Sequence, residues 1–200
     1  MEIILIRHGL TAGNLQKRYI GRTDEPLCPQ GIADIQKAGC FPSVAKVVVS
    51  LMLRARQTAS LLFPNADQQV RQDLGEMDFG VFEGKTADEM ADDSAYRAWV
   101  DGNCHDICPG GEGVVGFSAR VCAAFDQAVR QAISQEEERL IIVAHSGTLM
   151  AIMDRYAMPK REYWQWHVPA LNGWRAHLDR TTWDACPQLT AYLCIEEIRL

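Results

Sequence analysis

The sequence contains no long apolar run and no run of basic residues. No uninterrupted apolar stretch in its 200 residues approaches the roughly 20 residues that a membrane-spanning helix needs. The formal net charge is −6, the isoelectric point is near 5.4, and the Lys and Arg residues are scattered. We therefore expect neither a nucleic-acid partner nor a membrane partner.

The basic n-region of a signal peptide is also missing, since Met1 and Glu2 lead directly into an apolar stretch. We therefore expect a soluble, cytoplasmic protein. The sequence shows no repeat, no low-complexity segment and no linker, and 200 residues is an ordinary length for one domain. This predicts a single domain that spans residues 1–200.

The cysteines show no pairing pattern. They number seven, an odd count, and their spacing is irregular. Without an export signal, free thiols are the expected state. The stretch Cys104-His105-Asp106-Ile107-Cys108 could hold a metal ion, but a structural zinc site needs four ligands, usually in two clusters, and the sequence offers no second cluster. We expect an ordinary loop there.

Short apolar runs alternate with helical patterns along the chain. The first run, Ile3-Ile4-Leu5-Ile6, has the length and the β-branched residues of a strand buried on both faces. Such alternation predicts an α/β fold with a mostly parallel sheet covered by helices on both faces. The expected strands are residues 2–7, 46–50, an extended piece near 69–71, 139–144, 173–178 and 189–194. The expected helices are residues 30–40, 54–63, one or two within 85–102, 112–134 and 147–156, with a long polar loop at 8–28.

Groups that suit phosphate chemistry stand at the ends of three expected strands. Arg7 and His8 end the first strand, Arg54 opens the helix after the second, and His145 ends the strand at 139–144. In open α/β folds, ligands bind at the edge where the carboxyl ends of parallel strands meet. An Arg offers a fork of donors for phosphate, and a His can be a nucleophile. Singly, each is more often a surface ion-pair partner or a core residue, but together they predict an active site.

Four motifs in a fixed order strengthen this interpretation. They are Arg7-His8-Gly9 with Thr11 and Asn14, then Arg54-Ala55-x-Gln57-Thr58, Glu76-x-x-x-Gly80 and His145-Ser146-Gly147. In these motifs the chain resembles the histidine phosphatase superfamily, which includes the cofactor-dependent phosphoglycerate mutases. The resemblance spans most of the chain and implies the α/β fold of that family.

The resemblance also implies roles for individual residues. His8 would be the nucleophile that forms a phosphohistidine, and Glu76 would protonate the leaving oxygen and later deprotonate water. His145, if protonated, would add positive charge. The expected phosphate-binding residues are Arg7, Asn14, Arg54 and Ser146, and the expected substrate loop contains Arg18, Gly21 and Thr23.

Glu76 has neighbours that could take its role. The spacing from Glu76 to Gly80 matches the family and favours Glu76 over the nearby carboxylates Asp73, Asp78 and Glu83. No metal and no other cofactor is implied, because the arginines and His145 can supply the positive charge.

Three functions remain open at this point. A metal-independent phosphatase acting on a small phosphorylated metabolite is favoured, because the chain is short and ends with little tail. A phosphoglycerate mutase usually carries longer insertions and a C-terminal tail that shield its phosphohistidine from water. An inactive binding protein of the same fold tends to lose a catalytic histidine or arginine, and here Arg7, His8, Arg54 and His145 are all present.

The substrate is suggested by aromatic residues outside the catalytic motifs. The layout of Leu74–Glu83 and 109–113 is similar to that of the small-molecule phosphatases of the family, in particular those that act on α-ribazole 5′-phosphate. We therefore expect a nucleotide-like phosphomonoester under a lid formed by residues 85–113. The candidates to stack on its base are Tyr96, Trp99 and either Trp164 or Trp166, although each could equally be a core residue.

Overall fold

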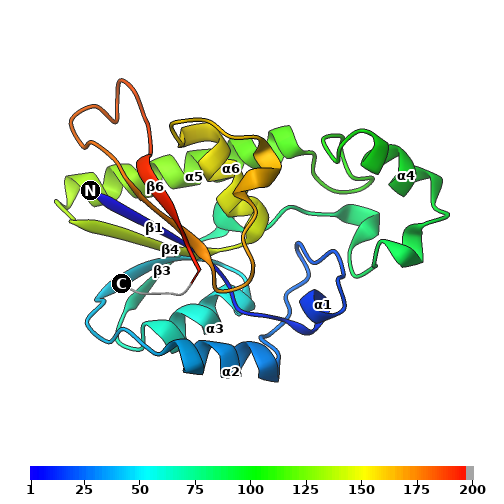
Figure 1. Ribbon diagram of the computed structural model, residues 1–200, viewed down its shortest axis with the longest axis horizontal. Coiled ribbons are helices and arrows are strands. Elements are labelled where there is room, and N and C mark those ends of the chain that lie inside the picture. The colour runs from blue at the N-terminus through cyan, green and yellow to red at the C-terminus, as the bar shows by residue number, and fades with distance from the viewer. Residues whose placement is uncertain (197–200) are drawn as a thin grey trace.

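One sheet of six strands, in the order β3-β2-β4-β1-β5-β6, forms the centre of the computed structural model, which describes residues 1–196 (Figure 1). The strands β1, β2, β3 and β4 are parallel to one another, β5 is antiparallel to β1, and β6 is antiparallel to β5. The predicted mostly parallel sheet is confirmed. The strands are β1 (Glu2–Arg7), β2 (Lys46–Ser50), β3 (Asp67–Arg71), β4 (Arg139–Ala144), β5 (Gly173–His177) and β6 (Thr190–Ile195).

Alternate residues of the central strands enter two separate hydrophobic layers. On β1, Ile3 and Leu5 belong to one layer, whereas Ile4 and Ile6 belong to the other. Side chains alternate across a strand, and helices cover both faces of this sheet, so every position of the strand must be apolar. This requirement explains why β1 is an unbroken apolar run.

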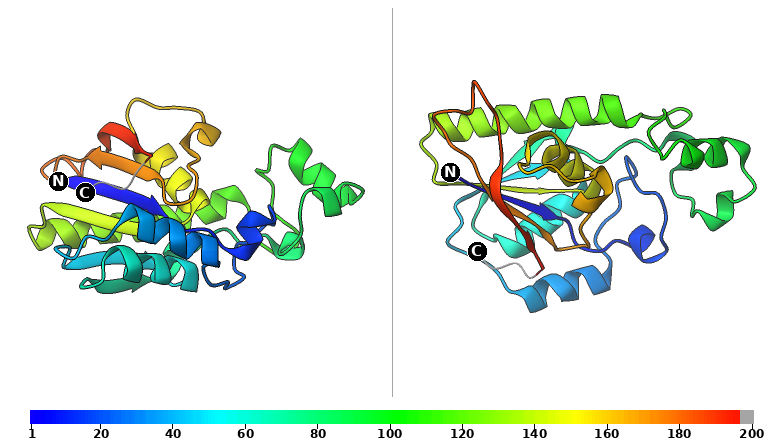
Figure 2. Two further views of the ribbon diagram at one scale, coloured as in Figure 1. Left: turned by 60° about the horizontal axis from the view of Figure 1, so that its bottom comes forward. Right: turned by 45° about the horizontal axis from the view of Figure 1, so that its top comes forward.

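Helices cover the two faces of the sheet in pairs (Figures 1 and 2). The α5 and α6 helices share a layer with Ile3 and Leu5, and α2 and α3 share the layer of Ile4 and Ile6. The predicted apolar stripe of α5 is buried at Phe117, Val121, Phe125 and Val129. The helices are α1 (Ala12–Leu15), α2 (Pro29–Ala38), α3 (Leu53–Leu62), α4 (Ser94–Asp101), α5 (Val114–Ser134) and α6 (Ser146–Tyr156).

The element boundaries differ from expectation in a few places. The α2 helix ends at Ala38 because the next residue, Gly39, has a φ of +90°, which a continuing helix cannot have. The expected loop at 8–28 contains α1, whose four residues are too few to show a helical period. The expected extended piece near 69–71 is a full strand, β3, which pairs with β2.

Residues 72–113 extend beyond the carboxyl ends of the parallel strands and carry α4 away from the sheet (Figure 1). This segment, which we call the lobe, includes the 3-10 turns Gln72–Leu74, Gly80–Phe82 and Asp88–Met90. It is tied to the 8–28 loop, because Tyr19 N donates to Lys85 O at 2.9 Å and Gly84 N donates to Tyr19 O at 2.8 Å. The lobe thus stands over the sheet edge where the predicted site lies.

All seven cysteines are free, as predicted. Within residues 1–196, no group of three or more His, Cys, Asp or Glu side chains is arranged to hold a metal ion. The same residues include no helix that is long and apolar enough to cross a membrane.

The packing of α5 predicts a stability difference between two positions of one helix. Phe125 is fully buried, whereas Val115 is 81% exposed. We expect Phe125→Ala to lower the free energy of unfolding by about 3–5 kcal/mol, because it leaves a cavity in the core. Val115→Ala should change it by less than about 0.5 kcal/mol. Urea unfolding of both variants tests this, and equal effects would contradict the assignment of the buried face.

Candidate active site

The polar ends of β1 and β4 and the start of α3 meet at one edge of the sheet. His8 N donates to Ala144 O at 3.0 Å, which places His8 beside His145, with the ring centroids 5.0 Å apart. Arg54 contacts both rings from the first turn of α3. A cavity of about 350 Å³ opens next to His8. The three strand ends singled out in the sequence are therefore brought together.

His8 is held in the tautomer that a nucleophile needs. Its Nδ1 lies 2.6 Å from Gly9 O, and a carbonyl can only accept, so Nδ1 carries the proton and Nε2 keeps a lone pair. Gly9 N in turn donates to Thr58 Oγ1 at 3.0 Å, which fixes the turn. Burial, Arg54 and Arg7 hold the pKa of His8 well below its usual value, so the ring is neutral at pH 7.

His145 is completely buried and is also neutral. Its Nδ1 accepts from Arg54 Nε at 3.3 Å, so its Nε2 carries the proton and donates to Ser50 Oγ at 2.7 Å. Burial first, and then Arg54 and His8, lower its pKa well below the usual value. The positive charge expected on His145 is therefore absent without a bound anion, although a phosphate dianion would raise this pKa. Sequence reasoning did not identify Ser50, which looks like an ordinary end of a strand.

Arg54 is only 1% exposed, and backbone carbonyls orient it. Its Nη1 donates to Thr23 O at 2.7 Å and its Nη2 to Gly21 O at 2.8 Å, while Nε points between His8 Nε2 and His145 Nδ1, 3.3 Å from each. A Cβ on Gly21 would lie 1.8 Å from Met77 O, so this close approach requires glycine. Gly21 and Thr23 were expected to contact substrate, but they hold Arg54 and do not line the cavity.

The remaining expected phosphate ligands line the cavity. Arg7 Nη1 donates to Val168 O at 2.7 Å and lies 3.5 Å from His167 Nε2. Asn14 Oδ1 accepts from Thr11 N at 3.2 Å, which leaves its amide NH2 as the end available to a ligand. Ser146 is the first residue of α6, so the amide groups of that helix start point toward the same place.

Arg18 lies at the rim of the cavity, but its guanidinium is already engaged. It forms an ion pair with Glu89 at 2.8 Å, and it also donates to Gly84 O and Gln16 Oε1. These contacts connect the 8–28 loop to the lobe. Arg18 therefore joins the 8–28 loop to the lobe at the rim of the cavity.

Glu76 lines the cavity with a carboxyl group fixed by two backbone amides. Met77 N donates to Oε1 and Gly147 N donates to Oε2, each at 3.0 Å. A Cβ on Gly147 would lie 2.3 Å from Glu76 Oε1, so this glycine leaves room for the carboxyl group. Burial raises the pKa of Glu76, which favours the protonated form that a general acid requires.

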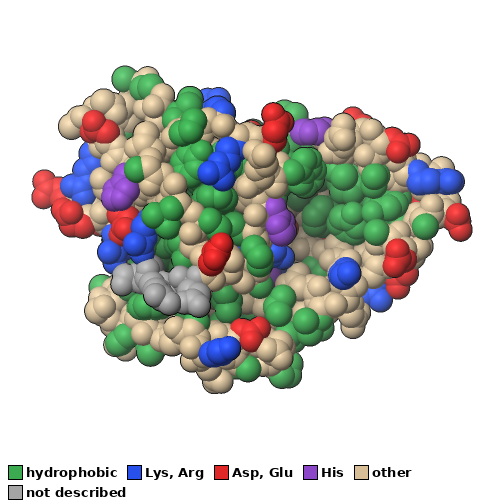
Figure 3. All heavy atoms as spheres, viewed as in Figure 1, with side chains coloured by type: hydrophobic (Ala, Val, Ile, Leu, Met, Phe, Trp, Pro, Cys, Tyr) green, Lys and Arg blue, Asp and Glu red, His purple; other side chains and the backbone are tan. Residues whose placement is uncertain are grey.

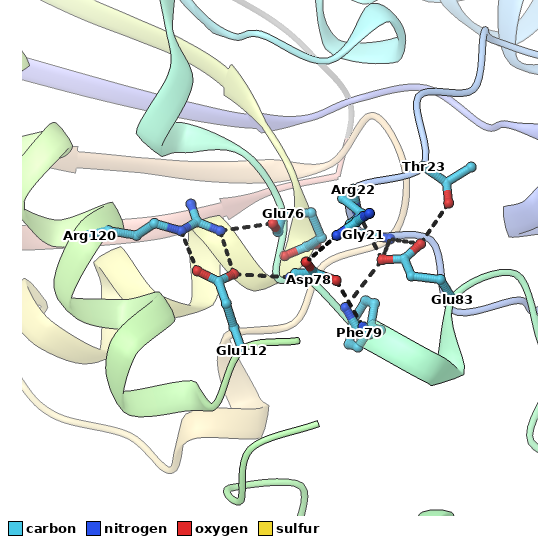
Figure 4. A network of polar contacts seen from close by, with 10 residues as sticks. Gly21, Arg22, Thr23, Glu76, Asp78, Phe79, Glu83, Glu112 and Arg120 are labelled. Atoms are coloured by element: carbon cyan, nitrogen blue, oxygen red, sulfur yellow. Dashed lines mark hydrogen bonds and ion pairs between the residues drawn. The ribbon is translucent and has the colours of Figure 1, made fainter. Parts of the chain in front are cut away.

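The alternative carboxylates have other roles. Asp78 pairs with Arg22 at 3.1 Å, and Glu83 accepts from the backbone of the 21–23 loop (Figure 4). Asp73 is exposed. None of the three lines the cavity, whereas Glu76 does. The structure thus supports the choice that the motif spacing made.

The far wall of the cavity is aromatic and apolar. Figure 3 shows hydrophobic side chains lining a hollow between the body of the molecule and the lobe. Trp99 and Trp164 line the cavity as expected, but Tyr96 and Trp166 do not. Tyr96 is buried and its hydroxyl bonds to that of Tyr19 at 2.9 Å, and Trp166 is fully buried against Trp174. Sequence reasoning missed the other aromatic lining residues, which are Tyr19, Phe79, Phe117 and Tyr163. His167, which belongs to no motif and could have been a core or a rim residue, also lines the cavity.

Comparison with known proteins supports the same interpretation. The family model of the histidine phosphatase superfamily (branch 1) matches residues 3–185. The adenosylcobalamin/alpha-ribazole phosphatase of Escherichia coli K12 is 31% identical over 176 residues, covering 84% of this chain and 85% of that protein. A 2,3-bisphosphoglycerate-dependent phosphoglycerate mutase of Methylocella silvestris is 30% identical over 168 residues, covering 76% and 79%.

A solved structure agrees with the sequence relatives. The crystal structure of the alpha-ribazole phosphatase from Shigella flexneri has a TM-score of 0.78 to this chain at 27% identity, covering 90% of this chain and 91% of that one. The family match includes the ends of β1, β2 and β4, where the expected catalytic groups lie. This chain therefore belongs to the histidine phosphatase superfamily, branch 1.

Proposed function

We propose that this histidine phosphatase hydrolyses a small phosphomonoester through a phosphohistidine on His8, without a metal ion. The observation that carries the proposal is the neutral Nε2 of His8, 3.3 Å from the buried Nε of Arg54 and beside a cavity whose far wall is aromatic. A lone pair next to a fixed cation is what in-line attack on a phosphate dianion requires. We further propose a cytoplasmic enzyme without a nucleic-acid partner, in keeping with its net charge of −6.

Substrate binding is the first step. Arg7 and Arg54 would neutralise the phosphoryl oxygens, with Asn14 and the amides at the start of α6 as further donors. The arriving dianion would raise the pKa of His145, so that a proton is taken up and the imidazolium adds to the positive charge. His145 would therefore carry its positive charge only while the phosphate group is bound.

Phosphoryl transfer then proceeds in two displacements. His8 Nε2 attacks phosphorus, the ester P–O bond breaks, and Glu76 gives its proton to the leaving alkoxide. Glu76, now a carboxylate, takes a proton from water, whose oxygen attacks the phosphohistidine. The P–N bond breaks, orthophosphate leaves, and both Glu76 and His8 return to their starting states.

The cavity favours an ester with a flat, apolar leaving group. Its volume of about 350 Å³ lies in the range of small-molecule sites, and Trp99, Trp164 and Tyr19 offer faces for a planar base. We propose α-ribazole 5′-phosphate as the substrate, which agrees with the names of the phosphatase relatives. Mutase activity on phosphoglycerate fits less well, because this small polar acid has no planar ring that could stack on the aromatic side chains of the cavity.

The role of His8 predicts the loss of turnover in His8→Ala. Phosphatase activity should fall to background, because His8 lines the cavity and places its Nε2 beside Arg54. By contrast, His145 lies beside Arg54 but does not line the cavity, and His167 lines the cavity beside Arg7. Rapid quench with a labelled substrate should trap an acid-labile, base-stable phosphoenzyme in the wild type and none in the variant. Substantial activity in a folded His8→Ala protein would overturn the proposed function.

The lowered pKa values predict two histidines that stay neutral below the usual pKa of the free ring. The 15N ring signals of His8 and His145 should keep the pattern of neutral imidazole when the pH falls from 7.5 to about 6, since their pKa is depressed. Saturating orthophosphate at pH 7 should convert His145 to imidazolium. A cationic His145 in the free protein at pH 7 would contradict this electrostatic account.

The aromatic wall predicts a substrate preference that depends on Trp164. The kcat/KM for α-ribazole 5′-phosphate should exceed that for 3-phosphoglycerate and sugar phosphates by more than tenfold. Trp164→Ala should lower it by roughly five- to hundredfold, as expected from a stacking contribution of ~1–3 kcal/mol, whereas Trp164→Phe should retain most of it. Both variants should leave sugar phosphate turnover unchanged. A preference for phosphoglycerate or a sugar phosphate would refute the substrate but not the phosphatase assignment.

A further inference from the structure

Arg120, on α5, divides its guanidinium between the backbone around Glu76 and the carboxylate of Glu112 (Figure 4). Its Nη1 donates to Asp73 O and Gly75 O, each at 3.0 Å, and its Nη2 donates to Glu76 O at 2.9 Å. Its Nε and Nη2 also form a bidentate pair with Glu112, at 2.7 Å to each carboxylate oxygen. A guanidinium has five N–H donors, and this pattern makes five hydrogen bonds.

Glu112 binds the chain on the other side of Glu76, so that Arg120 and Glu112 together form a clamp around this segment. Its Oε2 accepts from Asp78 N at 3.0 Å, and its own backbone N donates to Asp78 O at 2.8 Å. Arg120 therefore binds the carbonyls of residues 73, 75 and 76, while Glu112 binds the backbone of residue 78. The two residues of the proposed general acid region, Glu76 and Met77, are held between them.

Neither member of the clamp lines the cavity. The charge of Arg120 also helps to lower the pKa of His145, and its guanidinium lies 5.0 Å from the ring of Phe117, which lines the cavity. Effects by these two routes would act on every ester alike, whereas an effect through Glu76 depends on the leaving group. The carboxyl group of Glu76 is oriented by two amides, and one of them belongs to Met77, inside the clamped segment. A small shift of this backbone would turn the proton of Glu76 away from the leaving oxygen. Proton transfer needs hydrogen-bond distance, so such a shift lowers the rate.

We propose that Arg120 and Glu112 form a positioning pair for the general acid Glu76. The proposal rests on the proposed function, because it assumes that Glu76 donates the proton. It assigns a role to the segment 109–113, whose glycines bring Glu112 to the clamp: Gly111 packs so closely that a Cβ there would lie 2.3 Å from Asp78 O. The ion pair between Arg120 and Glu112 thereby connects α5 to the lobe that carries Glu76.

Another carboxylate of the lobe, Glu83, holds a different part of the backbone, namely the 21–23 loop and Phe79. It accepts from the amides of Gly21, Arg22 and Phe79 and from Thr23 Oγ1 at 2.8–3.2 Å. The loop that it holds supplies the carbonyls that orient Arg54. Loss of Glu83 should therefore weaken phosphate recognition for every ester, whereas loss of Arg120 should weaken leaving-group protonation.

The experiment compares kcat/KM on two esters, nitrophenyl phosphate with a good leaving group and an alkyl phosphate with a poor one. General acid catalysis contributes ~10²–10⁴-fold and matters least for a good leaving group. We expect Arg120→Gln and the milder Glu112→Gln to lower the rate on the alkyl ester by at least about tenfold and that on nitrophenyl phosphate by less than about threefold. Arg120→Lys should not rescue it, because a lysine keeps the charge but lacks the fork.

The pH profile provides a second readout. Burial keeps the pKa of Glu76 raised, although the amides of Gly147 and Met77 and the charges of Arg54 and Arg7 act to lower it. If the clamp holds the carboxyl group in its buried place, Arg120→Gln should let it reach water, and the pKa should fall toward the usual value. The alkaline limb of kcat/KM for the alkyl ester should then move to lower pH, which a mere loss of folded protein would not produce.

Control variants separate this inference from the proposed function. Arg130→Gln removes an α5 arginine that pairs with Asp126 and Asp184 on the surface, and it should leave both rates unchanged. Glu83→Gln should lower both rates together. In a Glu76→Gln background, Arg120→Gln should cost nothing further on the alkyl ester, since both act through one proton.

The outcomes are distinguishable. Equal losses on both esters in Glu76→Gln would show that Glu76 is not the acid, and the proposed function would need revision. A selective loss in Glu76→Gln combined with uniform losses in Arg120→Gln and Glu112→Gln would refute the positioning pair alone. Additive losses in the double variant would refute it as well.

Discussion

The burial of the Arg54 guanidinium is the interaction on which the site depends. A buried cation is costly unless it is paired or fully hydrogen-bonded. Here the hydrogen-bond partners are backbone carbonyls and two neutral imidazoles, and no carboxylate is among them. The N–H donors of Arg54 therefore have hydrogen-bond partners, but its positive charge is not neutralised by them. A phosphate dianion would be a suitable counterion. The folded protein is therefore destabilised by this buried charge, and a bound phosphate group would offset that free-energy cost.

The same charge sets the protonation of its neighbours. Together with burial, Arg54 keeps His8 and His145 neutral, and a nucleophile must be neutral to attack. The pKa of Glu76 shifts in the opposite direction, because burial raises it and favours the protonated carboxyl group. One desolvated pocket thus favours neutral imidazoles and a protonated carboxyl group at once, because desolvation disfavours the charged form of each.

Segments outside the sheet complete this arrangement. The parallel strands bring the histidines together, but the carbonyls that orient Arg54 come from the 21–23 loop. The backbone carbonyl of Glu76 is bound by Arg120 of α5, whose partner Glu112 binds the backbone of Asp78. Glu83 links the two, since it binds the 21–23 loop while it lies in the lobe. In the proposed mechanism, phosphate binding and proton transfer would therefore share a support outside the hydrophobic core, where loops vary more easily than strands.

The sequence alone was sufficient for the α/β fold and the order of the motifs. It also singled out His8, Arg54, Glu76 and His145, which the structure brings to one edge of the sheet. These features are local: a buried strand must be apolar throughout, and a polar residue at its end must face the sheet edge. The helix α1 and the exact ends of α2 were less accessible, because a four-residue helix has no period and a single glycine decides where a helix stops.

Only the tertiary structure decided which aromatics line the cavity, the neutral state of His145 and the purpose of Gly21, Thr23 and Arg120. Trp164 and Trp166 are two residues apart, yet one lines the cavity and the other is in the core. Burial, a pKa and a hydrogen bond between residues 44 positions apart, such as Arg120 to Glu76, depend on how distant segments pack. No local pattern of residue types encodes that packing, because it is settled by the chain as a whole.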